Sequence, residues 1–197
     1  AGDTRFDRVY EIAQQAKRLP EIERFAADAP VFIAGSTWPP DEELLVGLIE
    51  RYPDVKFIVA PHEIDPARIE KFCERISRPA LRYTQLTPQS DLAAAGVLFV
   101  DTIGILSSVY RYGRWGYIGG GFGAGIHNTL EAATFGLPLA FGPRYGKFRE
   151  ARDLVTLRGA ASIASAEELE RWFAGLHDDP DATGRSGTIC KEYVLQH

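Results

Sequence analysis

Five glycines within seven positions stand directly before a short run that contains a glutamate. The segment reads GGGFGAGIHNTLEAATFG from Gly119 to Gly136. Glycine has no Cβ, so its backbone can approach a ligand closely, and the amides of such a loop can surround a phosphate. Glu131, in the first turn of the expected helix, can accept two hydrogen bonds from a vicinal diol. The pattern favours a nucleotide-sugar site, with an ordinary glycine-rich turn as the alternative.

Three better-known signatures do not fit this segment. Gly119, Gly121 and Ala124 match the spacing of the dinucleotide fingerprint, but that fingerprint follows the first strand of a sheet and is followed by an acid about twenty residues later. The corresponding region, Leu139 to Pro143, has no acid. No Gly-Lys-Ser/Thr follows the glycines and no Gly-x-Ser-x-Gly occurs, which excludes a P-loop and gives no support to a nucleophile elbow.

The composition describes one globular domain. The chain has 197 residues, of which 45% are hydrophobic and 25% charged. Its formal charge of −5 argues against a general nucleic-acid binder, which needs basic residues to neutralise phosphates. No apolar run reaches the roughly eighteen residues of a transmembrane helix. Cys73 and Cys190 have neither metal-ligand nor disulfide spacing, which favours a reducing compartment.

Short apolar runs alternate with amphipathic stretches along most of the chain. This alternation is typical of parallel strands joined by crossover helices, and the near-continuous apolar character of the runs indicates strands covered on both faces. We therefore expect an α/β fold with a Rossmann-like, doubly wound parallel sheet. The strands are expected at Val31–Ala34, Lys56–Ala60, Leu81–Leu86, Val97–Val100, Gly116–Ile118, Pro138–Phe141 and Ala161–Ile163.

Capping residues mark several helix starts. Asp65 before Pro66 supplies an N-cap acceptor and a helical first residue. Ser165 with Glu168 forms a capping-box pattern. The acidic run Asp41 to Glu43 complements the macrodipole in the first turn of another helix, and we interpret these carboxylates as structural.

Two further stretches carry weaker signals. Residues Phe6 to Ala27 look helical and could pack outside the sheet as a lead-in element. The stretch from Asp178 to Gly187 is rich in Asp, Gly, Ser and Thr, which predicts a surface loop. We therefore expect a linker and helical lead-in at residues 1–30 and a nucleotide-sugar-binding domain at residues 31–197.

Ligands of an open α/β sheet bind beyond the carboxyl ends of its strands. The loops expected there are Gly35–Trp38, Pro61–Ile64, Asp101–Gly104 and Gly119–Asn128. Small residues dominate the first and last of these loops, so a phosphate could approach their amides, helped by the positive end of each following helix. All four loops should meet at one rim of the sheet.

These loops together resemble the carboxy-terminal domain of 3-deoxy-D-manno-octulosonic acid (Kdo) transferase, an enzyme of lipopolysaccharide synthesis. The resemblance runs from about Gly2 to the end of the chain. Bacterial members of the family are roughly twice this length, so an amino-terminal acceptor domain is expected to be absent from this chain. The residues that carry the resemblance are Gly35-Ser36-Thr37, Pro61-His62, Asp101-Thr102-Ile103-Gly104, Gly119-Gly120, Gly125 to Glu131, and Gly142-Pro143 with Phe148.

The resemblance implies a GT-B glycosyltransferase whose carboxy-terminal half holds a CMP-linked sugar. It places Pro61 and His62 against the nucleotide, and Ile103, Gly104 and Ile105 along the cytidine. The stretch Asn128, Thr129, Leu130 and Glu131 would hold the ribose and phosphate. Possible phosphate or sugar contacts are Ser36, Thr37, Gly125, His127, Arg144 and Lys147.

Two positions depart from the family pattern, because many relatives have Arg in place of His62 and Glu in place of Ile105. Several of the candidates also have a purely structural interpretation. Asn128 is a good N-cap, Glu131 is a suitable first-turn acid, and His127 could serve as a capping or hydrogen-bonding residue. A basic surface face is the alternative for Arg144, Lys147 and Arg149.

By the same resemblance, the general base is a glutamate of the missing half, so we expect no catalytic residue in this chain. We also expect no metal and no cofactor. The expected function is donor binding in an inverting transferase that moves Kdo from CMP-Kdo to a lipid A precursor. Alternatives are a GT-B enzyme with a UDP-linked donor and a non-catalytic nucleotide-binding module. The resemblance places the full enzyme at the cytoplasmic face of the bacterial inner membrane, with membrane association through the absent half.

Overall fold

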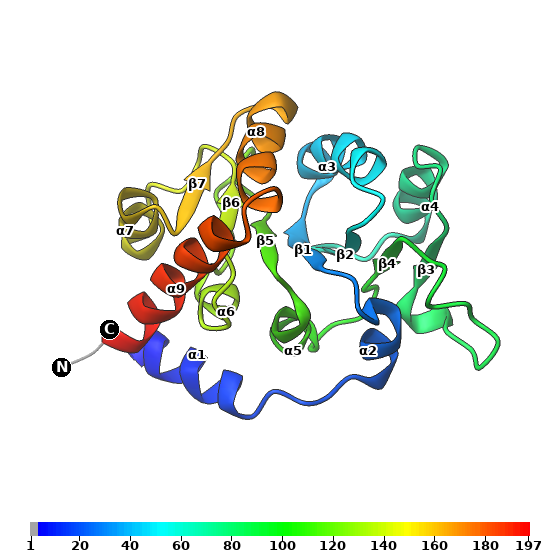
Figure 1. Cartoon of the computed structure of the whole chain (residues 1–197), viewed down its shortest axis with the longest axis horizontal. Helices are drawn as coiled ribbons and strands as arrows, with labels where there is room; N and C mark the ends of the chain where they lie inside the picture. The colour runs from blue at the N-terminus through cyan, green and yellow to red at the C-terminus, as the bar shows by residue number, and fades with distance from the viewer. Residues whose placement is uncertain (1–3) are drawn as a thin grey trace.

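A seven-stranded parallel sheet organises residues 4–197, the part of the chain that the computed structural model describes (Figure 1). The strand order is β3-β4-β2-β1-β5-β6-β7 and every neighbouring pair is parallel. The chain begins in the middle of the sheet and winds outward to both edges, which confirms the predicted doubly wound fold. The strands are β1 (Val31–Thr37), β2 (Lys56–Pro61), β3 (Ala80–Arg82), β4 (Val97–Phe99), β5 (Trp115–Ile118), β6 (Leu139–Phe141) and β7 (Ala160–Ser162).

Helices cover both faces of the sheet, and two hydrophobic clusters lie between helices and sheet. Along β1, Val31 and Ile33 belong to one cluster and Phe32 and Ala34 to the other, as the alternation of a pleated strand requires. The second cluster packs under α3 (Pro39–Arg51), α4 (Pro66–Glu74) and α8 (Ala166–His177). The first packs under α1 (Thr4–Gln14), α2 (Pro20–Ala26), α5 (Leu106–Val109), α6 (Leu130–Ala133), α7 (Arg149–Leu157) and α9 (Pro180–Gln196).

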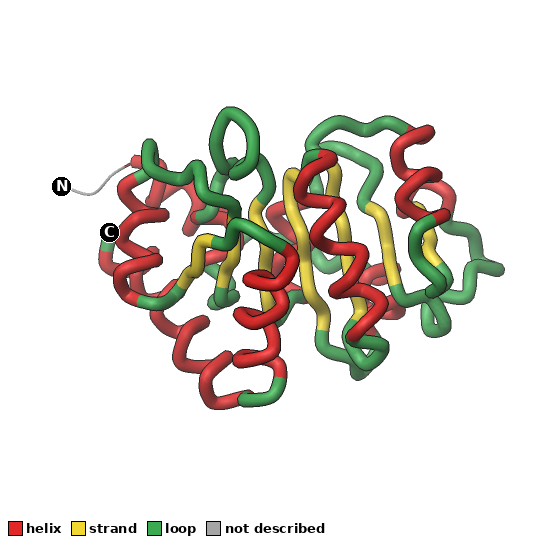
Figure 2. The backbone as a smooth tube through the Cα atoms, turned by 90° about the horizontal axis from the view of Figure 1, so that it is seen from above, coloured by secondary structure: helices red, strands yellow, loops and turns green. Residues whose placement is uncertain are grey.

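Seen from above, the strands lie side by side with helices in front of them (Figure 2), and Figure 1 shows α3, α4 and α8 on one side of the sheet and α1, α2 and α5 on the other. The predicted caps are in place. Asp65 Oδ1 accepts a hydrogen bond from the Ala67 amide at 3.1 Å, and Ser165 Oγ accepts from the Glu168 amide at 3.2 Å. No helix within residues 4–197 combines the length and apolarity that crossing a bilayer requires.

The strand predicted at Leu81–Leu86 is only partly correct. Strand β3 ends at Arg82, and a 3-10 turn (Tyr83–Gln85) follows. The reason is a side chain outside the segment: Asp101 accepts from the Thr84 amide at 2.8 Å and from its hydroxyl at 2.6 Å. These bonds turn the backbone away from the ladder.

The surface loop predicted at Asp178–Gly187 is wrong, because most of it lies in helix α9. Asp179 caps this helix by accepting from the Ala182 amide at 3.1 Å, and Pro180 is its first residue. Gly187 lies so close to the neighbouring loop that an added Cβ would be 2.2 Å from the Gly136 carbonyl oxygen. The glycine that suggested a loop instead permits close packing of the helix.

The lead-in stretch is helical as predicted, but it is broken into α1 and α2. Both helices contribute to the core. Phe25 is fully buried, and the Phe6 ring packs against Tyr193 of α9 with centroids 5.8 Å apart. Figure 1 shows α1 running alongside the end of α9.

Candidate functional site

Three of the four predicted loops are in direct contact at the carboxyl edge of the sheet. The His62 amide donates to the Thr37 carbonyl at 2.9 Å, and the Gly119 amide donates to the Gly35 carbonyl at 2.9 Å. The fourth loop starts one strand further out, beyond β2, to which β4 is paired. The rim is therefore formed by the central strands β1, β5 and β2, with β4 beside them.

The glycines of the 119–128 loop are required mainly by close backbone packing. A Cβ on Gly119 would lie 2.1 Å from the Ser36 carbonyl oxygen, and one on Gly121 would lie 2.6 Å from the Gly142 Cα. Gly120 and Gly125 have φ values of 98° and 145°, which residues with side chains rarely adopt.

Six of the ten amides of this loop are paired within the fold, so only part of the loop is open to a phosphate. The internally bonded amides are those of Gly119, Gly120, Gly123, Gly125, Ile126 and His127. The Leu130 amide is also occupied, since it donates to Asn128 Oδ1 at 2.7 Å. Within residues 4–197, the amides of Asn128 and Thr129 have no hydrogen-bond partner. Free amides therefore remain both at the start of α6 and within the glycine run, where those of Gly121, Phe122 and Ala124 also have no partner among residues 4–197.

Two carboxylates of the first turn of α3 connect the rim loops. Asp41 is 1% exposed and accepts three hydrogen bonds: from the Trp38 amide at 2.9 Å, the Gly120 amide at 3.1 Å and the Tyr117 hydroxyl at 2.5 Å. Glu42 accepts from Thr37 Oγ1 at 2.8 Å and forms an ion pair with Arg68 at 3.0 Å. These residues are structural, as predicted, but they hold the loops of the site in place rather than only complementing a helix dipole.

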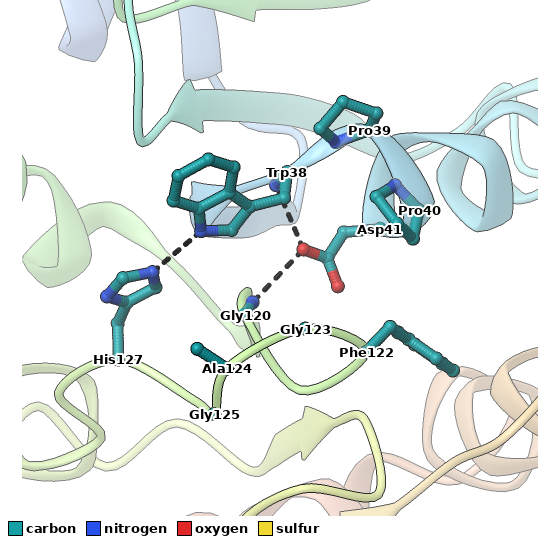
Figure 3. A pocket seen from close by; sticks show the side chains of 10 residues that line it. All are labelled: Trp38, Pro39, Pro40, Asp41, Gly120, Phe122, Gly123, Ala124, Gly125 and His127. Carbon is teal, nitrogen blue, oxygen red and sulfur yellow. Dashed lines mark hydrogen bonds between the residues drawn. The ribbon is translucent and has the colours of Figure 1, made fainter.

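Three aromatic rings from three loops stack beside the glycine run. His62 lies with its centroid 4.7 Å from Trp38 and 4.3 Å from His127, and both pairs are nearly parallel. The Trp38 indole Nε1 donates to His127 Nε2 at 2.8 Å (Figure 3). A cavity of about 300 Å³ opens beside them, lined by Trp38, Pro39, Pro40, Asp41, Gly120, Phe122, Gly123, Ala124, Gly125 and His127.

Glu131 is half-buried at the start of α6 and has no hydrogen-bond or ion-pair partner within residues 4–197. Burial raises the pKa of this carboxyl above its ordinary value. Two residues earlier in the chain, the Thr129 hydroxyl is buried and also lacks a partner among residues 4–197. An incompletely satisfied carboxylate and hydroxyl at a rim are groups that a polar ligand can satisfy. Leu130 is buried in the core, so only its backbone faces this position.

The loop after β4 is the most open part of the rim. Ile103 is 88% exposed, and a Cβ on Gly104 would meet nothing within 4 Å. Ile105 packs against the core at the start of α5. The preceding Asp101 anchors the loop: burial alone would raise the pKa of its carboxyl, but hydrogen bonds from Thr84 and Arg82 outweigh burial and lower it.

The remaining candidate residues differ in exposure and in whether their side chains are already hydrogen-bonded within the protein. Thr37 is fully buried and its hydroxyl donates to Glu42, so its side chain faces the protein. Ser36, with φ 54°, adopts a left-handed conformation at the bulge of β1. Arg144 is exposed and donates to the Gly123 carbonyl at 2.7 Å, whereas Lys147 is exposed without a partner among the described residues. The roles predicted for these residues stay predictions.

Residues 4–197 contain no group of three or more His, Cys, Asp or Glu side chains placed to hold a metal ion. The sequence reading missed Trp38 and the linking role of Asp41. A carboxylate three residues after an N-cap position was a signal for capping. Its bonds to Tyr117 and Gly120 had no local signal, because these partners are 76 and 79 residues away.

Comparison with known proteins identifies relatives by both sequence and fold. No family model matches the chain. The 3-deoxy-D-manno-octulosonic acid transferase of Chlamydophila psittaci is 25% identical over 177 residues, which are 88% of this chain and 40% of that protein. Further Kdo transferases, from Rickettsia and Aquifex, also match. The chain thus spans about two fifths of the length of this relative.

Two solved structures illustrate the fold similarity. The C-terminal CMP-Kdo binding domain of WaaA from Acinetobacter baumannii superposes with a TM-score of 0.76 at 22% identity, covering 97% of this chain and all of that one. HepE of Anabaena, solved with UDP-glucose, gives 0.64 at 15% identity over 93% of this chain and half of that one. The chain is therefore a relative of the Kdo transferases that corresponds to their carboxy-terminal domain, with the fold of a GT-B glycosyltransferase half.

Proposed function

We propose that this chain is the donor-binding domain of a glycosyltransferase that moves Kdo from CMP-Kdo to a lipid A precursor. The observation that carries the proposal is the match of nearly the whole chain to a domain described as binding CMP-Kdo, together with the sequence similarity to complete Kdo transferases. The acceptor, the general base and contact with the membrane belong, in this proposal, to the part of those relatives that the chain does not span. The complete enzyme then acts at the cytoplasmic face of the bacterial inner membrane.

The start of α6 is the proposed phosphate position. The amides of Asn128 and Thr129 are free there, whereas the amides directly before them, of Gly125, Ile126 and His127, are bonded within the protein. Transfer of the sugar leaves negative charge on the departing CMP phosphate. Amide dipoles fixed in advance stabilise such charge without reorganisation, and the loss of one such donor typically costs about 3 kcal/mol in the transition state.

Glu131 is the proposed ribose ligand. Its carboxylate is half-buried without a partner, which disfavours the ionised form and raises its pKa. Two ribose hydroxyls can donate to it and restore the hydrogen bonds that burial removed. The cavity beside Trp38 and His127, about 300 Å³ in volume, is then the proposed position of the sugar attached to the phosphate. This volume is at the lower end of the range for small-ligand pockets.

Calorimetric titration of the chain with CMP tests the proposal. We expect measurable CMP binding and a loss of about tenfold in affinity for Glu131→Gln, because two hydrogen bonds to a charged acceptor become weaker. Glu167→Gln is the matched control, since Glu167 is an exposed first-turn glutamate of α8. Equal affinities of wild type and Glu131→Gln would remove the ribose role, and no binding of CMP would overturn the proposal.

A GT-B enzyme with a UDP-linked donor is the second candidate, supported by the fold similarity to HepE with UDP-glucose. Direct competition between CMP and UDP distinguishes the two. Preference for CMP supports the Kdo donor, and preference for UDP supports the alternative. A domain that binds CMP, but whose complete protein transfers no sugar, would be the nucleotide-binding module of the third hypothesis.

A further inference from the structure

The indole of Trp38 and the imidazole of His127 form one flat unit in the wall of the cavity. Their rings are inclined by only 15°, with centroids 6.2 Å apart. The Nε1–Nε2 distance of 2.8 Å shows that they meet edge to edge through a hydrogen bond. His62 lies over both rings, 4.7 Å from one and 4.3 Å from the other. Three separate loops are thus joined through these rings.

The direction of this hydrogen bond determines where His127 carries its proton. An indole N–H can only donate, so Nε2 of His127 must be the nitrogen with the free lone pair. A neutral imidazole has one N–H, and it must then be at Nδ1. A protonated ring would direct a second N–H at the indole N–H. In agreement, burial and the neighbouring His62 lower the pKa of His127, and Asp41 offsets this only in part.

The Nδ1–H of His127 is an unused donor. It has no hydrogen-bond partner within residues 4–197, and Figure 3 shows Nδ1 on the side of the ring away from Trp38 and Gly120. His127 is directly followed by Asn128 and Thr129, whose amides are also free. Three donors are therefore consecutive in the chain at the proposed phosphate position.

We propose that Trp38 is a positioning residue that holds neutral His127 as the Nδ1–H tautomer, so that Nδ1 donates to the phosphate of the bound nucleotide. This step rests on the proposed function. Toward the phosphate of the nucleotide, Trp38 acts only through His127 and His62, whereas His127 touches the phosphate. The backbone supports the geometry, since the His127 amide donates to the Gly119 carbonyl at 3.1 Å and a Cβ at Gly120 would lie 3.1 Å from His127 Nε2.

Nitrogen chemical shifts of the His127 ring test the first half of the proposal without any ligand. We expect the spectrum of the wild-type chain to show a protonated Nδ1 and an unprotonated Nε2. Trp38→Phe keeps a ring for stacking and removes the donor, so we expect a mixture of tautomers in this variant. A wild-type spectrum with the proton at Nε2, or with both tautomers, would overturn the assignment. Thermal unfolding of the variant checks that it folds.

Affinity for CMP tests the second half. We expect Trp38→Phe to weaken CMP binding about fivefold, the usual contribution of one hydrogen bond. His127→Asn places an amide N–H near the position of Nδ1, whereas His127→Gln places it near Nε2. We therefore expect His127→Asn to stay within about twofold of wild type and His127→Gln to lose about fivefold.

The double variant Trp38→Phe/His127→Asn is the sharpest control. An asparagine side chain has no ring tautomers for Trp38 to select, so Trp38→Phe should cause no further loss of CMP affinity in this background. A further fivefold loss would show that Trp38 acts by packing alone and would overturn the proposal. If the wild-type chain binds no CMP, the proposed function fails and the phosphate role of His127 fails with it. If wild type binds CMP and Trp38→Phe binds equally well, only the positioning role fails.

Discussion

The two ends of the candidate site are built in different ways. At the end formed by β1 and β5, Asp41 and residues 119–121 are buried, and hydrogen bonds within the protein connect Asp41 to Gly120 and Tyr117 and Gly119 to Gly35. At the end formed by β4, Ile103 is 88% exposed and an added Cβ at Gly104 would meet no atom. The first end is held by contacts within the protein, whereas the second leaves apolar surface open to solvent.

The difference follows the chemistry that each end is proposed to do. Stabilising a phosphate requires donors that are already oriented, because reorienting them would cost much of the energy gained. A nucleoside base can instead be bound by apolar contacts. Their free energy is roughly proportional to the apolar area buried and does not depend on precise orientation. Substitutions at the first end should therefore affect folding as well as CMP binding, whereas a substitution at Ile103 should affect CMP binding alone.

Asp41→Ala should have the largest effect. It leaves the Trp38 amide, the Gly120 amide and the Tyr117 hydroxyl without an acceptor in the interior. We expect a loss of about 4 kcal/mol in the free energy of unfolding and no measurable CMP binding. Chemical denaturation and calorimetry are the measurements. Asp41→Asn is the control, since its amide can still accept from both backbone groups and donate to Tyr117; an equal loss in both variants would contradict this role.

Gly119→Ala compared with Gly123→Ala tests the packing of the glycine run. The first Cβ would lie 2.1 Å from the Ser36 carbonyl oxygen, whereas the second has its nearest neighbour at 3.8 Å. We expect Gly119→Ala to lower the free energy of unfolding by about 3 kcal/mol and Gly123→Ala to change it by less than about 0.5 kcal/mol. Equal stabilities of the two variants would show that the run is a loosely packed turn.

Glu131→Gln should weaken CMP binding and stabilise the free protein. Because burial raises the folded-state pKa of this carboxyl, its ionised form destabilises the free protein at neutral pH. That cost disappears as the pH falls below the ordinary pKa of a glutamate. We expect the variant to be more stable than wild type at pH 7, by on the order of 0.5 kcal/mol, with the difference vanishing near pH 4. Thermal unfolding against pH measures it; a variant less stable at pH 7 would contradict the raised pKa.

Ile103→Ser should have the smallest effect on folding. The side chain is almost entirely in solvent, so we expect a change within about 0.5 kcal/mol in the free energy of unfolding. If the cytosine base of the nucleotide covers Ile103, CMP affinity should fall about threefold through the loss of apolar contact. The exposed Leu157 of α7 provides a control substitution away from the rim. Unchanged CMP affinity for Ile103→Ser would place the base elsewhere.

Much of the fold could be predicted from the sequence, because its signals are local. The apolar runs, the caps at Asp65 and Ser165 and the glycines after β5 each depend on residues within a few positions of one another. Errors arose where a distant residue intervened. Asp101 ended β3 by accepting hydrogen bonds from Thr84, and Gly187, one of the glycines that suggested a loop, instead packs its helix against Gly136.

For the site, the sequence by itself determined which loops meet and which residue types they carry. It did not determine which amides remain free, because the acceptors for the amides of Gly119, Gly120 and Ile126 come from other parts of the chain. Nor did it indicate that Trp38, His62 and His127 stack, since 89 residues separate the two partners of the Trp38–His127 bond. Local patterns specify the elements, whereas hydrogen-bond pairing is decided only when the sheet brings distant loops together.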